Sequence, residues 1–261
     1  MSAGMTAAGL WRYRELLGHL AARNLKVKYK RSTLGFVWTL LNPILTIAVL
    51  VAVFTYIVRI RVEAYWAFLV SGYFVWNFVI QMLNTSTWIL AEHAPLRRSV
   101  RFPMVVPILA AGASRLVEFS VELLLVLVAL IVLHHGGVPA SWILLPLLLA
   151  LLLLVTFGLV LPLASLAAYY HDVQHVLPIV LMTLFYASPV FYPVGMVPEA
   201  VRAFYYLNPI AGLLTLFHTV LYEGAWPPLA LLLGMTAGGG LLAALGYATF
   251  VRHESVFVEI L

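Results

Sequence analysis

The feature that most constrains this chain is a series of six long apolar stretches with almost no charge. A helix needs roughly 20 mostly apolar residues to cross about 30 Å of hydrocarbon. Hydrophobic residues make up 64% of the 261 residues and charged residues only 10%, which fits a chain embedded in lipid better than one with a water-soluble core. The predicted spans lie at 34–58, 64–91, 104–133, 142–170, 176–192 and 227–251.

We therefore predict an all-α integral membrane protein with six transmembrane helices in a domain at 34–251. Residues 1–33 form a cytoplasmic N-terminal segment and 252–261 a cytoplasmic tail. The N-terminal residues are too polar for a cleavable signal, so we expect the first span to be retained. Between spans 5 and 6, the apolar run 210–222 is too short to cross and is typical of a re-entrant helix. Residues 193–226 are thus expected at the outer face.

The distribution of positive charge predicts the orientation. Of the 15 Lys and Arg residues, only Arg59, Arg61 and Arg202 fall on the side opposite the N-terminus, and Arg115 lies within a span. The positive-inside rule then places both termini in the cytoplasm.

The N-terminal segment combines apolar residues at helical spacing with cations on other faces. This pattern predicts an amphipathic helix in the cytoplasmic membrane interface. A run of charge that merely fixes the orientation is an alternative, and the two interpretations are compatible. The apolar positions are Leu10, Tyr13, Leu17, Leu20 and Val27, and the cations are Arg12, Arg23, Lys26 and Lys30.

Several kinds of chemistry have no residues to support them. The chain has no cysteine, and all its lysines lie at positions 26–30, so no Gly-rich loop can supply the phosphate-binding lysine of a P-loop. The cytoplasmic segments are also too short to fold a nucleotide-binding domain. His171 and His175 have the i, i+4 spacing of metal ligands, but no third ligand accompanies them. We predict no catalytic residue, metal or cofactor in this chain, and no nucleic-acid partner, because the basic residues flank membrane spans.

Three charged residues interrupt the third span. Arg115, Glu118 and Glu122 are three and four residues apart and so share one helix face. Intramembrane charge suggests function by default, and these residues could serve transport or proton movement. The other interpretation is structural, because a span of this length extends beyond the hydrocarbon and lets Arg115 pair with Glu118 near the cytoplasmic interface.

Aromatic residues cluster within span 2, for example at Trp76, and toward the end of span 5, for example at Tyr186. Trp and Tyr at such places usually form an interfacial belt. Rings that face a pore would instead offer sugars a stacking surface and hydroxyls for hydrogen bonds.

Short motifs in register along the chain resemble one family of membrane proteins. Around the first span, the matching positions are Tyr29, Ser32, Leu34, Gly35, Trp38 and Pro43. Further matches are Phe102-Pro103, Tyr170-His171-Asp172-Val173, Ser188-Pro189 with Tyr192, Asn208-Pro209 and Phe257-Val258-Glu259. The chain thus resembles the permeases of type-2 ABC exporters of polysaccharides, namely O-antigen, teichoic acid and capsule.

The resemblance implies a homodimer in the bacterial cytoplasmic (inner) membrane, bound to two copies of a separate ATPase that holds Mg-ATP. It also implies outward movement of a lipid-linked glycan through a channel at the dimer interface. Residues 193–226 would correspond to the outer gate. The loops after spans 2 and 4 would contact the ATPases through Glu92, Arg97, Arg98, Arg101, His171 and Asp172. Aromatic candidates for the glycan channel are Trp38, Phe54, Tyr186, Phe191 and Tyr192.

The family commonly has Arg-Asp where this chain has His171-Asp172, so a titratable group replaces a permanent charge in that turn.

Two other functions compete with this interpretation. An ion-coupled secondary transporter would use Arg115, Glu118 and Glu122 and need no ATPase, although no internal repeat supports it. A membrane-embedded transferase would need converging acid, base or metal ligands at one depth, and the sequence offers no adequate set.

Overall fold

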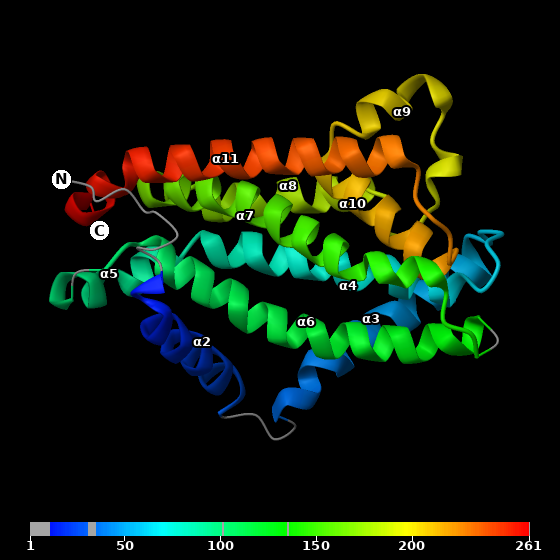
Figure 1. Ribbon diagram of the computed structural model, residues 1–261, viewed down its shortest axis with the longest axis horizontal. Coiled ribbons are helices and arrows are strands. Elements are labelled where there is room, and N and C mark those ends of the chain that lie inside the picture. Colours follow the sequence, from blue (N-terminus) through cyan, green and yellow to red (C-terminus); the bar gives the residue numbers. More distant parts are fainter. Residues whose placement is uncertain (1–10, 31–34, 101, 135, 261) are drawn as a thin grey trace.

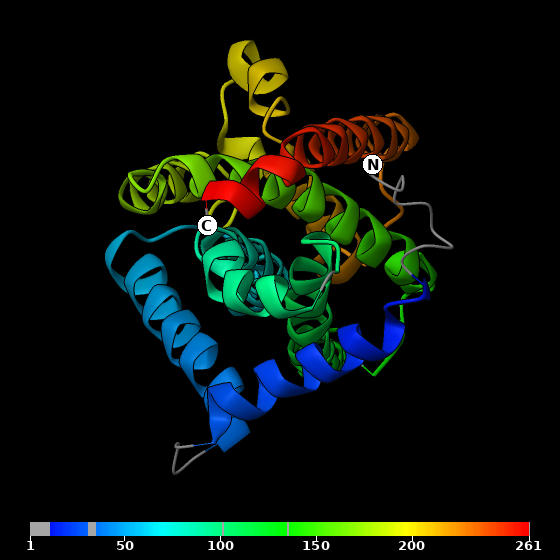
Figure 2. The same ribbon diagram turned by 90° about the vertical axis from the view of Figure 1, so that its left-hand side faces the viewer.

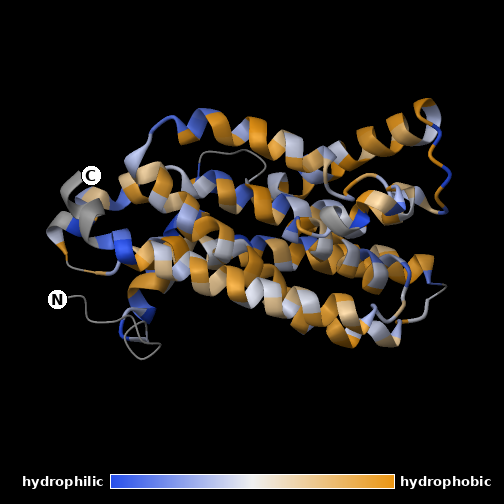
Figure 3. Ribbon diagram, turned by 90° about the horizontal axis from the view of Figure 1, so that it is seen from above, coloured by the Kyte–Doolittle hydropathy of each residue, from blue (hydrophilic) through white to orange (hydrophobic). Residues whose placement is uncertain are grey.

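The computed structural model describes residues 11–30, 35–100, 102–134 and 136–260. Within these ranges the chain is helical with connecting turns and contains no strand, which confirms the all-α prediction. The long helices run side by side along one axis, and the start of α2 lies toward the same end as the end of α11 (Figure 1). Apolar residues dominate the middle of these helices, and hydrophilic ones gather mostly toward the ends (Figure 3). The protein is thus a multi-pass membrane protein.

The helices follow the predicted order. Their bounds are α2 Arg14–Tyr29, α3 Trp38–Ala52, α4 Tyr65–Ser86, α5 Ile89–Ser99, α6 Val105–Leu133, α7 Leu145–Tyr169, α8 Val173–Tyr186, α9 Glu199–Tyr205, α10 Pro209–Phe217 and α11 Leu229–Ile260. Short 3₁₀ turns precede α3 and α7 at Gly35–Val37 and Ala140–Leu144, and a third lies at Val194–Met196. Wider π-helical turns extend α3 and α10 at Val53–Ile57 and His218–Tyr222.

Five of these segments are long and apolar enough to cross a membrane: Gly35–Ile57, Tyr65–Ser86, Val105–Leu133, Ala140–Tyr169 and Leu229–Glu254. The predicted fifth span, 176–192, is represented by α8, which has only 14 residues. At 1.5 Å per residue α8 is about 21 Å long, shorter than the hydrocarbon. It ends before Ser188-Pro189 because proline disfavours helical geometry at the residue before it.

The predicted second span, 64–91, is two helices in the structure. Helix α4 ends at Ser86 and α5 begins at Ile89. The hydroxyls of Thr85, Ser86 and Thr87 donate to the carbonyls of Gln81, Leu83 and Asn84 at 2.6–2.8 Å. Such side-chain bonds to a helix's own carbonyls compete with the helical ladder and bend it. As a result, most of the expected loop after span 2 is the helix α5.

Helix α4 forms the centre of the bundle. Its side chains at Phe68, Phe78 and Val79 are buried, and it packs against α3, α6, α7 and α10. The re-entrant helix α10 is buried along almost its whole length, whereas α9 projects from the bundle (Figure 1). Asn208 caps α10 by accepting from the Ile210 amide at 3.0 Å, and its amide donates to Ser188 Oγ at 2.8 Å. Two of the short sequence motifs therefore meet in space.

Helices α7 and α11 approach closely where both carry glycine. A Cβ atom built at Gly246 would lie 2.5 Å from the carbonyl oxygen of Gly158, and one at Gly158 would lie 2.9 Å from the Ala243 amide nitrogen. Small residues at such crossings let helix backbones touch, which is a main source of association within lipid.

This contact predicts that Gly246→Ala lowers the melting temperature of the detergent-solubilised protein. Overpacking of this kind costs about 1–3 kcal/mol. Gly234→Ala in the same helix is the matched control, because a Cβ there meets nothing within 4 Å. Equal melting temperatures for the two variants would contradict the close-packed contact.

Candidate functional site

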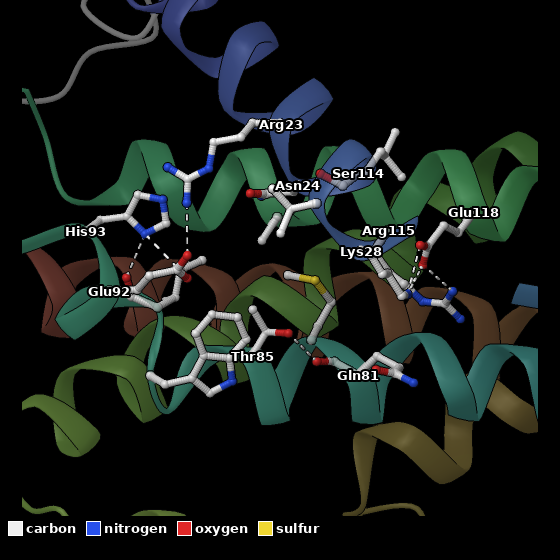
Figure 4. Close-up of a pocket in the computed structure, with 16 residues that line it drawn as sticks. Arg23, Asn24, Lys28, Gln81, Thr85, Glu92, His93, Ser114, Arg115 and Glu118 are labelled. Atoms are coloured by element: carbon white, nitrogen blue, oxygen red, sulfur yellow. Dashed lines mark hydrogen bonds and ion pairs between the residues drawn. The ribbon is translucent and has the colours of Figure 1, made fainter. Parts of the chain in front are cut away.

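Two ion pairs hold the N-terminal helix α2 against the bundle. Arg23 Nη2 lies 2.9 Å from Glu92 Oε1 in α5. Lys28 Nζ donates to both carboxylate oxygens of Glu118 in α6, at 2.8 and 2.9 Å. Figure 4 shows both pairs beneath α2. Figure 2 shows α2 crossing one side of the bundle. The amphipathic helix is thus fixed at two points, one in α5 and one in α6.

The second ion pair continues into a buried charge network within α6. Arg115 Nη1 lies 3.0 Å from Glu118 Oε2 and 2.9 Å from Glu122 Oε1, and Arg115 Nη2 lies 3.0 Å from Glu122 Oε2. The predicted Arg115–Glu118 pair is present. Each carboxylate oxygen of the two glutamates accepts at least one hydrogen bond, so neither charge is buried without a partner.

Tyr29 extends the network to α3. Its hydroxyl donates to Glu118, and the Thr39 hydroxyl then donates to Tyr29, because Tyr29 has a single proton to give. Burial and the hydrogen bond to Glu118 raise the pKa of the Tyr29 phenol, so it remains a donor. Through these bonds α2, α3 and α6 share one polar centre. We call Lys28, Tyr29, Arg115, Glu118 and Glu122 the charge network.

A groove of about 360 Å³ lies between α2, α4, α5 and α6, beside the charge network. Its polar lining includes Arg23, Asn24, Gln81 and Glu92, shown as sticks in Figure 4. A second hollow of about 190 Å³ lies toward α3 and is lined by Trp38, Asn42, Tyr73 and Asn77 among others. Lys28, Gln81 and Arg115 line both cavities. The charge network therefore lies between the two cavities.

The residues predicted to contact an ATPase lie near one end of the bundle. Glu92 and Arg97 belong to α5, and His171 and Asp172 are exposed in the turn before α8. These two segments are close, since Gln174 Nε2 in α8 donates to the Thr87 carbonyl before α5 at 3.3 Å.

The structure does not describe the side chains of two other predicted contact residues. Arg98 is within α5 but its side chain is not described, and Arg101 lies outside the described residues.

Four of the five predicted channel aromatics meet at the opposite end of α3. Phe191 stacks on Phe54 with ring centroids 4.9 Å apart and lies edge-on to Tyr192 at 5.0 Å and to Tyr186 at 5.6 Å. Trp38 begins α3 and lies away from this group. It lines the smaller cavity, as Lys28 and Tyr29 do. We call Phe54, Tyr186, Phe191 and Tyr192 the aromatic cluster.

Sequence reasoning missed the partners of Glu118 and Tyr29 that α2 and α3 supply. Lys28, Tyr29 and Thr39 are far from Glu118 along the chain, and Lys28 was one cation among several in a basic run. The amphipathic pattern was a weak guide. Leu20 is buried, whereas Val27, which shares its predicted face, is exposed. Only the way α2 lies against α6 distinguishes Lys28 from the other cations of the run.

No group of three or more His, Cys, Asp or Glu side chains among the described residues could hold a metal ion. The polar centre therefore consists of ion pairs and hydrogen bonds between helices.

Comparison with known proteins shows the family of the chain. The family model described as ABC-2 type transporter matches residues 15–222, from α2 through the π-helical turn after α10. The chain belongs to the ABC-2 type transporter family. This membership covers both the charge network and the aromatic cluster.

Curated relatives match along most of their length. The chain is 30% identical over 254 residues to the O-antigen export system permease protein RfbA of Myxococcus xanthus, with 96% of each chain covered. It is 26% identical over 251 residues to the protein of the same name from Klebsiella pneumoniae, with 95% of each covered. The polysialic acid transport protein KpsM of Escherichia coli is 22% identical over 209 residues, which cover 78% of this chain and 80% of KpsM.

The charge network predicts that Arg115→Met is strongly destabilising, by about 3–5 kcal/mol, because it leaves Glu122 buried without its cation. The double variant Arg115→Met/Glu122→Met should be less destabilised than the single one, since it removes both charges. Unfolding of the detergent-solubilised variants measures this difference. A double variant at least as unstable as Arg115→Met would show that Glu122 contributes something other than pairing with Arg115.

Proposed function

We propose that this chain is the membrane-spanning subunit of an exporter that moves a lipid-linked polysaccharide, of O-antigen, teichoic-acid or capsule type, out of the cytoplasm. The observation that carries the proposal is the similarity to an O-antigen export permease over 96% of both chains. In this proposal two copies form the channel in the bacterial cytoplasmic (inner) membrane. Two copies of a separate subunit bind Mg-ATP and hydrolyse it, and both termini of the permease face the cytoplasm.

The proposed ATPase contact combines α5 with the turn that holds His171 and Asp172. Helix α5 contacts the last helix, α11, and the Gln174–Thr87 hydrogen bond links α5 to the turn. From α5, the Arg23–Glu92 ion pair leads to α2, and Tyr29 leads on to Thr39 in α3. A displacement of α5 by the ATPase would therefore reach α3 through two polar contacts that the helix α2 connects, which is a physical route for coupling.

The proposed channel lies between copies, at α3 and α8. Both helices have exposed apolar side chains, such as Val49 in α3 and Ile179 and Met182 in α8. The aromatic cluster joins their outer ends, and the Tyr186 side chain is 57% exposed. An aromatic surface with phenol hydroxyls could stack on sugar rings and hydrogen-bond their hydroxyls.

The function is tested in a bacterial strain that lacks its own polysaccharide exporter. The chain and a candidate partner ATPase from the same organism are expressed together or singly, and surface polysaccharide is measured by immunoblot. We expect export only when both are present, and no ATP hydrolysis by the purified chain alone. Export without any ATPase, or robust nucleotide turnover by the isolated chain, would refute the proposal.

In the same strain, Asp172→Lys should lower export sharply while membrane insertion stays normal, because it reverses the charge of the proposed contact. Glu199→Lys is the matched control, since it makes the same charge change in α9, on the predicted outer side. Equal export by both variants would overturn the docking assignment.

The aromatic cluster predicts that Tyr186→Ala/Phe191→Ala slows export but leaves assembly and ATPase activity unchanged. Each ring contact is worth about 0.5–1.5 kcal/mol, so a double variant gives the clearer effect. Trp226→Ala removes an exposed aromatic at the start of the last span and serves as the control for membrane anchoring. Normal export by a correctly inserted double variant would show that these rings anchor the protein in the membrane interface and do not contact the glycan.

A further inference from the structure

The groove beneath α2 has an apolar wall beside hydrogen-bonding groups that are not fully used. The wall comes from residues of α2, α4, α5 and α6 and from the Trp88 ring between α4 and α5. The apolar lining residues are Leu25, Val27, Met82, Trp88, Ile89 and Ala111. Such a cavity, mostly apolar with a few convergent polar groups, is typical of a ligand site, and the apolar wall favours an amphipathic ligand.

Each cation that lines the groove is paired with a carboxylate, but Arg23 and Arg115 keep unused N–H donors. Among the described residues Arg23 gives only one hydrogen bond, to Glu92, although a guanidinium has five N–H donors. Arg115 Nε is buried with no hydrogen-bond partner among the described residues. The groove therefore has N–H donors free to bind a hydrogen-bond acceptor.

An unused acceptor lies next to these donors. His93 is only 2% exposed, and its Nδ1 lies 2.9 Å from the Ile89 carbonyl oxygen. Because a carbonyl only accepts, Nδ1 carries the proton, and Nε2 of the neutral ring is left as an acceptor. Nε2 is buried without a partner among the described residues. Its neighbour Glu92 bonds Arg23, so the free donors and this acceptor lie on either side of one carboxylate.

The groove lies where a membrane lipid can reach it. The interfacial helix α2 forms its roof, and the lining residues Val27 and Trp88 are exposed. On the other side of α2, a hollow of about 650 Å³ is lined by His19, Lys26 and Lys30 together with Arg23 and Val27. Lys26 and Lys30 attract an anionic headgroup toward α2, since basic residues near a membrane surface favour anionic lipids.

We propose that this groove binds one molecule of an anionic phospholipid with a hydroxylated headgroup, phosphatidylglycerol. The phosphate accepts hydrogen bonds from Arg23 and Lys28, a headgroup hydroxyl donates to His93 Nε2, and an acyl chain follows Val27 and Trp88. A phosphodiester matches the free donors of Arg23 and the nearby cations Lys26 and Lys30, and the glycerol hydroxyl supplies the donor that His93 lacks. The site is separate from the aromatic cluster and does not depend on the proposed export.

The test is native mass spectrometry of the full chain purified in detergent and titrated with single lipids. Phosphatidylglycerol should remain bound at about tenfold lower concentration than phosphatidylcholine. Arg23→Gln should lose about tenfold in affinity, whereas Lys26→Gln, which removes the same charge from α2 outside the groove, should lose far less. Ala111→Phe fills the groove without changing charge and should abolish the bound lipid.

The headgroup hydroxyl is tested with phosphatidylmethanol, which has the same phosphodiester charge but no hydroxyl. Wild type should prefer phosphatidylglycerol over phosphatidylmethanol, and His93→Phe should remove that preference. Unchanged melting temperatures confirm that the variants are folded.

Equal loss in Arg23→Gln and Lys26→Gln would show a diffuse attraction to α2 and overturn the site. Retained binding in a folded Ala111→Phe would do the same. Stronger binding of a polyprenyl phosphate, or equal occupancy by inorganic phosphate, would overturn the assignment to phosphatidylglycerol.

Discussion

The structure of this protein depends on one buried arginine that two carboxylates of its own helix enclose. An unpaired charge in the hydrocarbon would be costly, and Arg115 avoids that cost through Glu118 and Glu122. Because the Glu118 carboxylate can accept several hydrogen bonds, it also accepts them from Lys28 and Tyr29 of α2. The same group that stabilises the inside of α6 therefore also positions the interfacial helix, and Tyr29 carries that position to Thr39 in α3.

The helical architecture could be predicted from the sequence because lipid imposes a strict rule on backbone hydrogen bonds. Long apolar stretches must be helices when every amide and carbonyl has to be satisfied internally. Spans 1, 3, 4 and 6 accordingly appear close to their expected places. The rule says less about where helices stop. The division after Ser86 and the early end of α8 arise from hydroxyl bonds and from Pro189, which are local effects that hydropathy does not register.

The candidate site was predictable only where its members share a helix. Arg115, Glu118 and Glu122 have a spacing that reveals a common face, so their pairing could be expected. Lys28 and Arg23 reach partners that are 90 and 69 residues away, and such contacts depend on how α2 lies against the bundle. Trp38 and Phe54, both expected beside the channel, lie at opposite ends of the segment Gly35–Ile57 because they are far apart along it. Shared helix membership places residues at known depths, but it does not bring them together.

The side chains of the charge network differ widely in their exposure to solvent. The Lys28 side chain is 50% exposed, whereas that of Glu118 is only 3% exposed. Without Lys28, the carboxylates Glu118 and Glu122 would share Arg115 alone, and one buried negative charge would be left uncompensated. The position of α2 is therefore tied to the charge balance inside α6, because a half-exposed lysine supplies the second cation that the buried pair of glutamates requires.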